Sequence, residues 1–516
     1  MSPGAQRLTC FAGYSLDVDY PVVMVHKIEH RTGWRTRDSI VLLAVTFVAA
    51  LIRLVRLGEP PVIIFDETYY AKDACWYVTA SQDLCGIEGE QTGIHPPLGK
   101  WLMAVGVKLF GYDAFGWRIA AAVAGVITVA LLYVLARKLL RSTSAATLTA
   151  GLLAFDFLHF VQSRVAMLDV FVSMFGVAAL LFLVYDRDRL IEGRSPAGLL
   201  HRRWRLAAGA AAGAAVASKW SGIFYVVLII LLTVVWEMTA RREAAPRRWW
   251  QRTLREEGPS ILVGLVLVPV LIYVVSYAGR LEGEVLAAPW GDGSWVQSLI
   301  DRQDYMLSTH LNLEANHAYQ SPAWSWILVK RPVSYFYEQT EAGESKEVLA
   351  LGNPFVWWVS IAAMAFVAYR WIRRRDLRGP EGIILAGFIV TYLPWLAQPT
   401  DRPAVFIFYL LPTVPFMCLA LGYVGKSLGR GWGARAALSV YGAIAIISFG
   451  YFYPVMADLP LARGAWDGRI WFESCDRVPA TVRTSTLVET KRAATITRTE
   501  LTTTEESPPT NGWCWI

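Results

Sequence analysis

Long apolar runs separated by short polar stretches constrain this sequence more than any other feature. The chain has 516 residues, of which 55% are hydrophobic and only 18% are charged. Soluble domains carry about a quarter charged residues, whereas apolar runs of roughly 15–20 residues are typical of helices that cross a bilayer. The sequence therefore predicts an all-α polytopic membrane protein, expected in the cytoplasmic membrane.

Basic residues between these runs indicate how the chain crosses the membrane. They cluster in alternate loops, which is the pattern of loops on the cytoplasmic side, so the net charge of +7 does not indicate nucleic-acid binding. Arg35 and Arg37 precede the first run, so we expect a cytoplasmic N-terminus, about eleven spans and a C-terminus outside. The predicted spans are 40–57, 117–135, 145–160, 165–185, two within 206–236, 259–277, 354–368, 383–396, 404–423 and 437–453.

The same pattern divides the chain into three regions. We expect residues 1–34 to be a disordered cytoplasmic tail and residues 35–475 to form the membrane domain, with outer loops at 58–116 and 278–352. In the first loop, 97–110 resembles an amphipathic helix on the membrane surface. Residues 476–516 are rich in Thr and read as a disordered outer tail.

Six cysteines are too few for a disulfide scaffold in a chain of this length. Cys75 and Cys85 nevertheless fall in one outer loop, where disulfides are permitted, and Cys475 and Cys514 are also expected outside. Each of the two pairs is a candidate disulfide.

Ionisable residues gather at one level of the predicted membrane, at the outer ends of the spans. They are Asp66, Glu67, His95, Arg118, Asp156, His159, Arg164, Asp169, Lys219 and Arg402. Such residues are usually functional, and a transporter is expected to place them near the midplane instead. A polar layer at the outer face suits chemistry on a lipid phosphate.

The residue types in this layer match the needs of sugar transfer from a lipid phosphate. The departing phosphate requires cations, which Arg and Lys provide. The accepting hydroxyl requires a carboxylate that takes its proton. Asp66 and Glu67, adjacent and directly after the first span, are the candidates for this role.

Several motifs identify a family with this chemistry. They are Phe65-Asp66-Glu67-Thr68-Tyr69-Tyr70, His95-Pro96-Pro97-Leu98-Gly99-Lys100, Gly111-Tyr112 with Gly116-Trp117-Arg118, Arg164 with Met167-Leu168-Asp169, Ser218-Lys219-Trp220-Ser221-Gly222, His317-Ala318-Tyr319-Gln320-Ser321 with Trp324, and Gly352-Asn353-Pro354 with Trp357-Trp358. In this order they resemble the bacterial protein O-mannosyltransferases, which are GT-C-fold enzymes that use polyprenyl-phosphate-mannose. The resemblance covers about 35–472, and Ala318 stands where the family has Pro.

The resemblance implies a role for each matched residue. Asp66 is expected to be the base that activates a Ser or Thr hydroxyl, with Glu67 beside it. The residues expected near the donor and its phosphate are Arg118, Lys219, Arg402, His95, Arg164 and Asp169, and those expected on the acceptor side are His317, Tyr319 and Trp324.

The resemblance also implies the reaction and its partners. We expect an inverting enzyme without a metal or other cofactor. Its expected partners are the lipid-linked donor, secreted or membrane acceptor proteins, membrane lipids and the secretion channel.

Structural interpretations stand beside these roles. Asp66 and Glu67 are suited to cap a helix, Arg164 and Asp169 to form a structural ion pair, and Lys219 to reach the headgroups. The spacing of His310, Glu314 and His317 also suggests zinc, although the expected reaction needs no metal. Two other functions stay open: a GT-C enzyme that moves another sugar, such as arabinose or aminoarabinose, to a glycan or lipid, and a membrane transporter.

Overall fold

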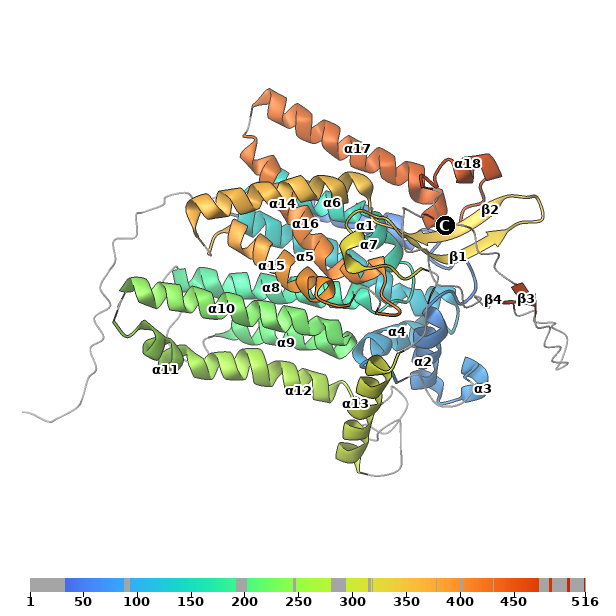
Figure 1. Ribbon diagram of the computed structural model, residues 1–516, viewed down its shortest axis with the longest axis horizontal. Coiled ribbons are helices and arrows are strands. Elements are labelled where there is room, and N and C mark those ends of the chain that lie inside the picture. Colours follow the sequence, from blue (N-terminus) through green and yellow to red (C-terminus); the bar gives the residue numbers. More distant parts are fainter. Residues whose placement is uncertain are drawn as a thin grey trace, which may run out of the picture.

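A computed structural model describes residues 33–87, 93–191, 202–244, 247–279, 294–313, 317, 319–376, 378–399, 402–429, 431–472, 482–484, 499–501 and 515. Most of these residues form a bundle of helices that run side by side (Figure 1). The bundle helices are α1 (Thr36–Leu54), α5 (Ala114–Leu140), α6 (Thr143–Ala154), α8 (Asp169–Ile191), α9 (Arg203–Ser218), α10 (Ile223–Ala244), α11 (Trp249–Leu262), α12 (Val268–Val275), α14 (Pro354–Arg374), α15 (Pro380–Leu396), α16 (Val414–Ser427) and α17 (Trp432–Met456).

The described helices confirm a polytopic membrane protein. Seven helical segments are long and apolar enough to cross a bilayer: Ala114–Leu140, Asp169–Arg189, Trp220–Arg242, Trp249–Val275, Pro354–Arg374, Ile407–Ser427 and Trp432–Met456. The helices α6 and α15 are apolar but shorter, and α1 and α9 occupy two more of the predicted spans. The count of eleven stays a prediction.

One predicted span, 145–160, is not a single helix. The chain leaves α6 at Ala154 and starts the short helix α7 (Phe157–Gln162) after Asp156. Asp156 causes this break because its carboxylate accepts the backbone N–H of His159 at 2.9 Å and the indole N–H of Trp357 at 2.7 Å. A buried Asp that caps a new helix cannot continue the old one.

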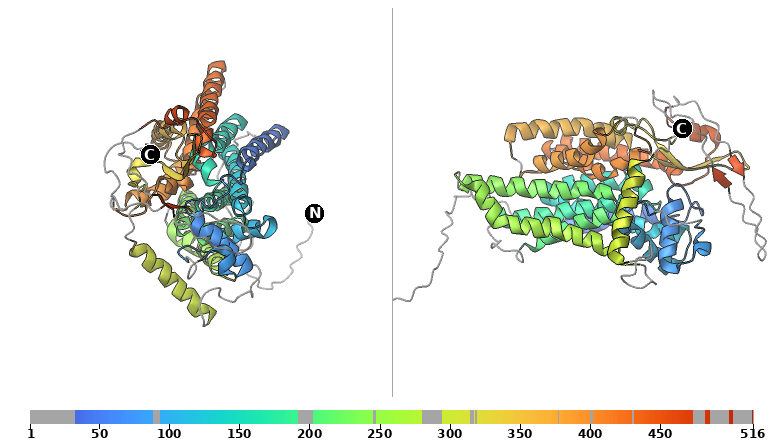
Figure 2. Two further views of the ribbon diagram at one scale, coloured as in Figure 1. Left: turned by 90° about the vertical axis from the view of Figure 1, so that its right-hand side faces the viewer. Right: turned by 60° about the horizontal axis from the view of Figure 1, so that its bottom comes forward.

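The loops at one end of the bundle form a cap of short elements (Figure 1). These elements are α2 (Glu67–Thr79), α3 (Gln82–Cys85), α4 (Leu98–Phe110), α13 (Trp295–Leu311) and the antiparallel hairpin of β1 (Val333–Gln339) and β2 (Ser345–Ala350), in which Val333 pairs with Ala350. In the segment predicted as an outer loop, 278–352, the hairpin departs from the all-α expectation. Figure 2 shows α13 crossing the bundle helices rather than following them.

Helix α4 is the segment predicted to lie on the membrane surface. It is amphipathic, since Val105 and Leu109 are exposed, but Met103 and Ala104 are fully buried. Gly106 approaches α5 so closely that an added Cβ would lie 2.3 Å from the carbonyl oxygen of Gly116. The segment is therefore part of the packed cap, where a larger residue than Gly would not fit.

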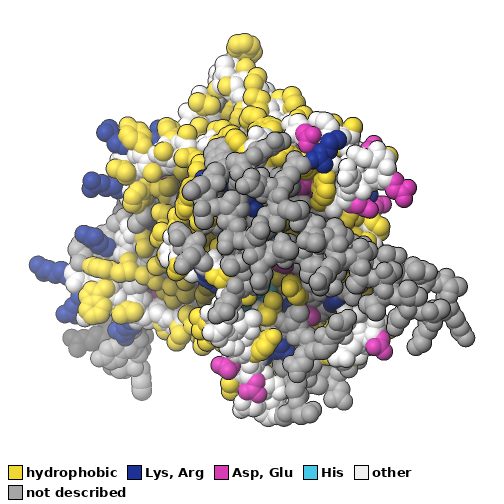
Figure 3. Space-filling model, turned by 45° about the vertical axis from the view of Figure 1, so that its right-hand side comes forward, with side chains coloured by type: hydrophobic (Ala, Val, Ile, Leu, Met, Phe, Trp, Pro, Cys, Tyr) yellow, Lys and Arg dark blue, Asp and Glu magenta, His cyan; other side chains and the backbone are white. Residues whose placement is uncertain are grey.

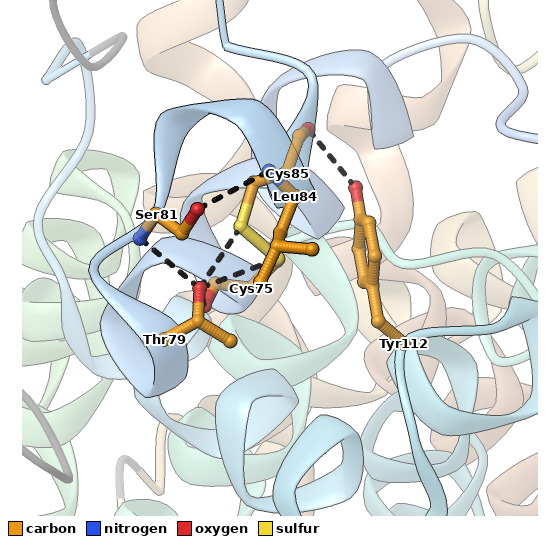
Figure 4. Close-up of a disulfide and its surroundings, with 6 residues drawn as sticks. All are labelled: Cys75, Thr79, Ser81, Leu84, Cys85 and Tyr112. Atoms are coloured by element: carbon orange, nitrogen blue, oxygen red, sulfur yellow. Dashed lines mark hydrogen bonds between the residues drawn. A yellow bond between two sulfur atoms is a disulfide. The ribbon is translucent and has the colours of Figure 1, made fainter. Parts of the chain in front are cut away.

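A disulfide between Cys75 and Cys85 ties α2 to α3, as the sequence suggested (Figure 4). The hydroxyl of Thr79 lies beside both sulfur atoms, and the Tyr112 hydroxyl donates to the Cys85 carbonyl at 3.4 Å. The second candidate pair, Cys475 and Cys514, lies outside the described residues, as does the predicted tail up to residue 32.

The predicted disordered tail, 476–516, contains some ordered elements among its described residues. Short strands β3 (Val482–Thr484) and β4 (Thr499–Leu501) pair with each other. Trp515 is fully buried, stacks on Trp471 and donates its backbone N–H to the Phe472 carbonyl at 2.9 Å. The disorder expected for 476–516 as a whole stays a prediction.

Charged side chains separate toward the two ends of the molecule. Figure 3 shows most of the visible Lys and Arg side chains along its left edge, acidic side chains toward its right and lower edges, and hydrophobic side chains between them. Two of the basic residues, Arg202 and Arg205, are buried and share the carboxylates of Asp186, Glu237 and Glu257 at 2.6–3.4 Å. This ion-pair cluster joins α8, α9, α10 and α11.

Candidate active site

Asp66 lies at the first turn of α2, in a backbone that is held under strain. Phe65, directly before it, has a positive φ of 46°, which is unfavourable for a bulky residue. The Phe65 ring stacks on Tyr335 with centroids 4.4 Å apart and meets Phe406 and Phe408 edge to face. This packing holds Phe65 in place and fixes the position of Asp66.

The Asp66 side chain does not cap its helix. Although Asp66 occupies the N-cap position of α2, its carboxylate makes no capping hydrogen bond. It is partly exposed, whereas Glu67 is fully buried. The carboxylate is therefore available for a ligand, and the capping interpretation does not hold for Asp66.

The surroundings of Asp66 bring the pKa of its carboxyl to a value suited to proton transfer. Burial raises the pKa of its carboxyl to about 6, and the negative charge of Asp169 acts in the same direction. The Lys219 ammonium and a hydrogen bond from Tyr70 act against the rise. A base with a pKa close to neutral is ionised at physiological pH and can still accept a proton.

Lys219 and Asp169 form a buried ion pair next to Asp66. The Lys219 ammonium lies 2.8 and 3.0 Å from the two carboxylate oxygens of Asp169. It also lies 4.4 Å from the centre of the Tyr409 ring. Lys219 is only 7% exposed, so it does not reach out toward lipid headgroups. The alternative in which Asp169 pairs with Arg164 was wrong, because Asp169 binds Lys219 instead.

Glu67 and Arg118 form a second buried ion pair with a different role. Nε and Nη2 of Arg118 donate to the Glu67 carboxylate at 2.7 and 2.8 Å. Nη1 donates to the carbonyls of Leu57 and Pro60, and Nη2 also donates to the carbonyl of Val62. Glu67 also accepts backbone N–H groups from Ile64 and Ala166.

This arrangement leaves neither residue free for a substrate. Every N–H of the Arg118 guanidinium has a protein acceptor, and both side chains are 0% exposed. The geometry therefore does not support phosphate binding by Arg118 or a direct catalytic role for Glu67. The pair fastens the loop before Asp66 to α5.

We predict that Arg118→Ala lowers the stability of the protein more than it lowers substrate affinity. Removing one partner of a buried ion pair leaves an uncompensated charge and costs about 3–5 kcal/mol. Thermal unfolding of the purified variant should show a clearly lower midpoint, and the double variant Arg118→Met with Glu67→Gln should recover part of the loss. An unchanged midpoint with a raised KM for the donor would restore the phosphate-binding role.

Arg164 holds the end of α1. Its guanidinium donates to the carbonyls of Arg53, Val55 and Arg56 at 2.6–2.8 Å. The last carbonyls of a helix have no partner within the helix, so Arg164 satisfies them from outside. Its predicted contact with the donor is not supported by this geometry.

His95 packs against Tyr70 of α2. Its ring centre is 5.9 Å from Tyr70 and 5.3 Å from His310, which packs on Trp220. Burial holds the pKa of His95 well below its usual value, and the Lys219 charge lowers it further, so His95 is neutral. Within the described part of the chain its Nδ1 has no hydrogen-bond partner, which leaves a polar atom available for a sugar or peptide group.

Arg402 also belongs to this neighbourhood. Its Nη1 donates to Gln398 at 2.7 Å, and its charge lowers the pKa of His310. Lys219 acts on His310 in the same way. The two cations thus approach the same group from separate loops.

The three residues predicted on the acceptor side separate in space. His317 packs edge-on against Phe65 and Phe406, and its Nδ1 accepts the backbone N–H of Tyr319 at 3.1 Å. Trp324 is 51% exposed and carries Lys330 over its ring. His317 therefore adjoins Asp66 through Phe65, and Tyr319 packs on His317. Trp324 is exposed to solvent, and among the residues that the structure describes its ring packs on neither of them.

The zinc interpretation finds no support in this geometry. His310 packs on His95 and Trp220, whereas His317 packs on Phe65 and Phe406, and Glu314 lies outside the described residues. Among the residues that the structure describes, no three His, Cys, Asp or Glu side chains converge on a metal position.

Tyrosines complete the surroundings of Asp66, and the sequence did not single them out. The charges of Asp66 and Asp169 both raise the pKa values of Tyr70 and Tyr335, beyond the effect of burial. Tyr409 lies under Lys219. Tyr70 follows the acidic pair in the first motif, but nothing in the sequence relates Tyr335 or Tyr409 to it.

Comparison with solved structures defines the class of this fold. The S. cerevisiae protein O-mannosyltransferase Pmt1-Pmt2 complex bound to the sugar donor is similar, with a TM-score of 0.70 at 15% identity, over 85% of this chain and 92% of that chain. ArnT from Cupriavidus metallidurans in the apo state gives a TM-score of 0.51 at 18% identity, over 84% and 72%. The fold is that of the GT-C membrane glycosyltransferases.

Sequence comparison then identifies the family. The family model described as dolichyl-phosphate-mannose-protein mannosyltransferase matches residues 113–279, and the one described as the C-terminal four TMM region of protein-O-mannosyltransferase matches 295–475. The polyprenol-phosphate-mannose–protein mannosyltransferase of Mycolicibacterium smegmatis is 32% identical over 87% of this chain and 94% of its own length. That of Mycobacterium tuberculosis is 31% identical over 88% and 94%. The chain belongs to the protein O-mannosyltransferase family.

Proposed function

We propose that this protein transfers mannose from polyprenyl-phosphate-mannose to Ser or Thr hydroxyls of proteins as they emerge at the outer face of the cytoplasmic membrane. The observation that carries the proposal is a partly exposed Asp66, with a pKa near 6, beside the buried pair of Lys219 and Asp169. A base next to a cation is what transfer from a lipid phosphate to an alcohol requires.

In the proposed reaction the acceptor oxygen attacks C1 of mannose while its proton passes to Asp66. The bond between C1 and the phosphate oxygen breaks, and the polyprenyl phosphate leaves with the electron pair. Lys219 and Arg402 stabilise the charge that develops on the phosphate. Attack from the face opposite the phosphate inverts the anomeric centre, so a β-linked donor gives an α-linked product. The cations of the chain supply the positive charge, so the proposal includes no metal.

The proposed orientation places the cap of short elements outside and the basic end of the bundle in the cytoplasm. It is supported by the separation of charges visible in Figure 3 and by the general excess of Lys and Arg in cytoplasmic loops. The disulfide of Cys75 and Cys85 lies in the cap, which agrees with an oxidising compartment.

The test of the proposed function compares donors with the purified protein. We expect transfer from polyprenyl-phosphate-mannose to a Ser/Thr peptide and little from the corresponding arabinose or aminoarabinose donors. Preference for another sugar or for a glycan or lipid acceptor would identify a different GT-C enzyme. Movement of the donor across liposomes without transfer would identify a transporter.

We predict that the activity falls as the pH is lowered through about 6. Because burial raises the pKa of Asp66 to that value, the carboxylate is ionised above pH 6 and becomes protonated below it. A plot of kcat/KM against pH should therefore rise about tenfold per pH unit on the acid side and level off above this pKa. A profile that stays flat down to pH 4.5 would contradict a base with this pKa.

A further inference from the structure

A cavity of about 1280 Å³ opens at the basic end of the bundle, away from Asp66. It lies between α1, α6 and α17, and Figure 2 (left) shows α1 and α17, in blue and red, projecting from the same side of the bundle. Pockets for small ligands usually measure about 300–1,000 Å³, so this cavity is large enough for a larger molecule. Nothing in the proposed transfer reaction uses it.

The mouth of the cavity is strongly basic. Five exposed cations line it: Arg35, Arg37, Arg141, Lys426 and Arg435. No Asp or Glu belongs to the lining, and in the described part of the chain none of the five forms an ion pair. A sixth cation, Arg137, is already bound to Asp38 at 2.8 Å. The Glu381 carboxylate acts on Lys426 from outside the lining, but the five cations leave the mouth with a net positive charge, which favours an anionic ligand.

The walls beyond the mouth are apolar. They are formed by Val41, Val45 and Val48 of α1, by Leu148 and Leu152 of α6, and by Leu438 and Ile446 of α17. From Arg35 to Val48 the rise of a helix gives a depth of about 20 Å. One leaflet of hydrocarbon is about 15 Å thick, so the cavity is as deep as a lipid chain in one leaflet.

Two glycines in the lining leave the space beside them unfilled. A Cβ added to Gly151 of α6 or to Gly442 of α17 would meet nothing within 4 Å, and both residues line the cavity. Side chains at these two positions would therefore project into the open space. Gly450, farther along α17, is equally open but does not line the cavity.

We propose that this cavity binds one phospholipid with an anionic head group from the leaflet at the basic end of the bundle. The phosphate lies among Arg141, Lys426 and Arg435, and an acyl chain follows the apolar walls toward Phe155. The site is distinct from that of the sugar donor, whose phosphate must lie beside Asp66 at the other end. The inference does not depend on the proposed function.

The test is native mass spectrometry of the full-length protein purified in detergent with equal amounts of phosphatidylglycerol and phosphatidylcholine. We expect the wild type to retain one phosphatidylglycerol in preference to phosphatidylcholine. The variant R141Q/R435Q should lose this preference by on the order of tenfold, since each basic residue near a membrane surface contributes to the attraction for anionic lipid. The matched control R373Q/R375Q removes the same charge from exposed residues at the end of α14, outside the cavity, and should keep the preference.

A second pair of variants tests the apolar part of the cavity with all charges in place. G151L/G442L should lower retention of phosphatidylglycerol, and the control G450L should not. Equal retention of the two lipids by the wild type would show that only general boundary lipid is bound and would overturn the proposal. So would R141Q/R435Q behaving like its control, or G151L/G442L retaining as much lipid as G450L.

Discussion

Replacement of Asp66 by Asn is expected to lower the rate of mannose transfer by about 10²- to 10⁴-fold, the usual contribution of a general base. Asn keeps the shape of the side chain but cannot take the proton of the acceptor hydroxyl. Asp66 makes no capping bond in α2, so the variant should unfold at nearly the same temperature as the wild type. Single-turnover transfer with saturating donor and peptide measures the effect.

The control for this substitution is Asp83→Asn. Asp83 is an exposed carboxylate in the same loop, between α1 and α5, so its loss should leave transfer almost unchanged. If the Asp66→Asn and Asp83→Asn variants turned over at similar rates, Asp66 would not be the general base.

Replacement of Lys219 by Met is expected to lower kcat by about 10²- to 10³-fold, as loss of a preorganised charge at the transition state usually does. Lys219 also lowers the pKa of Asp66. Without it, the acid side of the pH profile should move to higher pH. This second effect distinguishes loss of the charge from general damage to the site, because misfolding would reduce activity at every pH.

Lys108→Met provides the comparison for Lys219. Lys108 is an exposed cation in the last turn of α4, and neither kcat nor the pH profile should change when it is replaced. If Lys219→Met raised only the KM for the donor and left the pH profile in place, Lys219 would contribute to ground-state binding alone.

The sequence predicted the centre of the site better than its surroundings. Asp66 and Lys219 were identified from motifs, and the structure brings them close enough for Lys219 to act on the pKa of Asp66. Arg118 and Arg164 were equally prominent, but most of their partners are backbone carbonyls of distant segments. A sequence shows that an Arg is charged but does not show which backbone carbonyls its guanidinium will contact. From sequence alone, an Arg bonded to backbone carbonyls therefore cannot be distinguished from one that binds phosphate.

The helical part of the fold followed from hydropathy, and two deviations depend on contacts between segments far apart in the sequence. The break at Asp156 depends on a hydrogen bond with Trp357, which is 201 residues away. The site tyrosines Tyr335 and Tyr409 come from the hairpin and from a short 3-10 helix, Ile407–Thr413. Contacts between segments so far apart in the sequence leave no periodic pattern to detect.

The most direct test of the whole account is a structure of the protein with the polyprenyl-phosphate-mannose donor and a Ser/Thr peptide bound. We predict that the acceptor hydroxyl lies about 2.6–3.2 Å from an Asp66 carboxylate oxygen and that the Lys219 ammonium lies beside the donor phosphate. A complex in which the sugar and its phosphate bind away from Asp66, or in which another carboxylate faces the hydroxyl, would contradict the account.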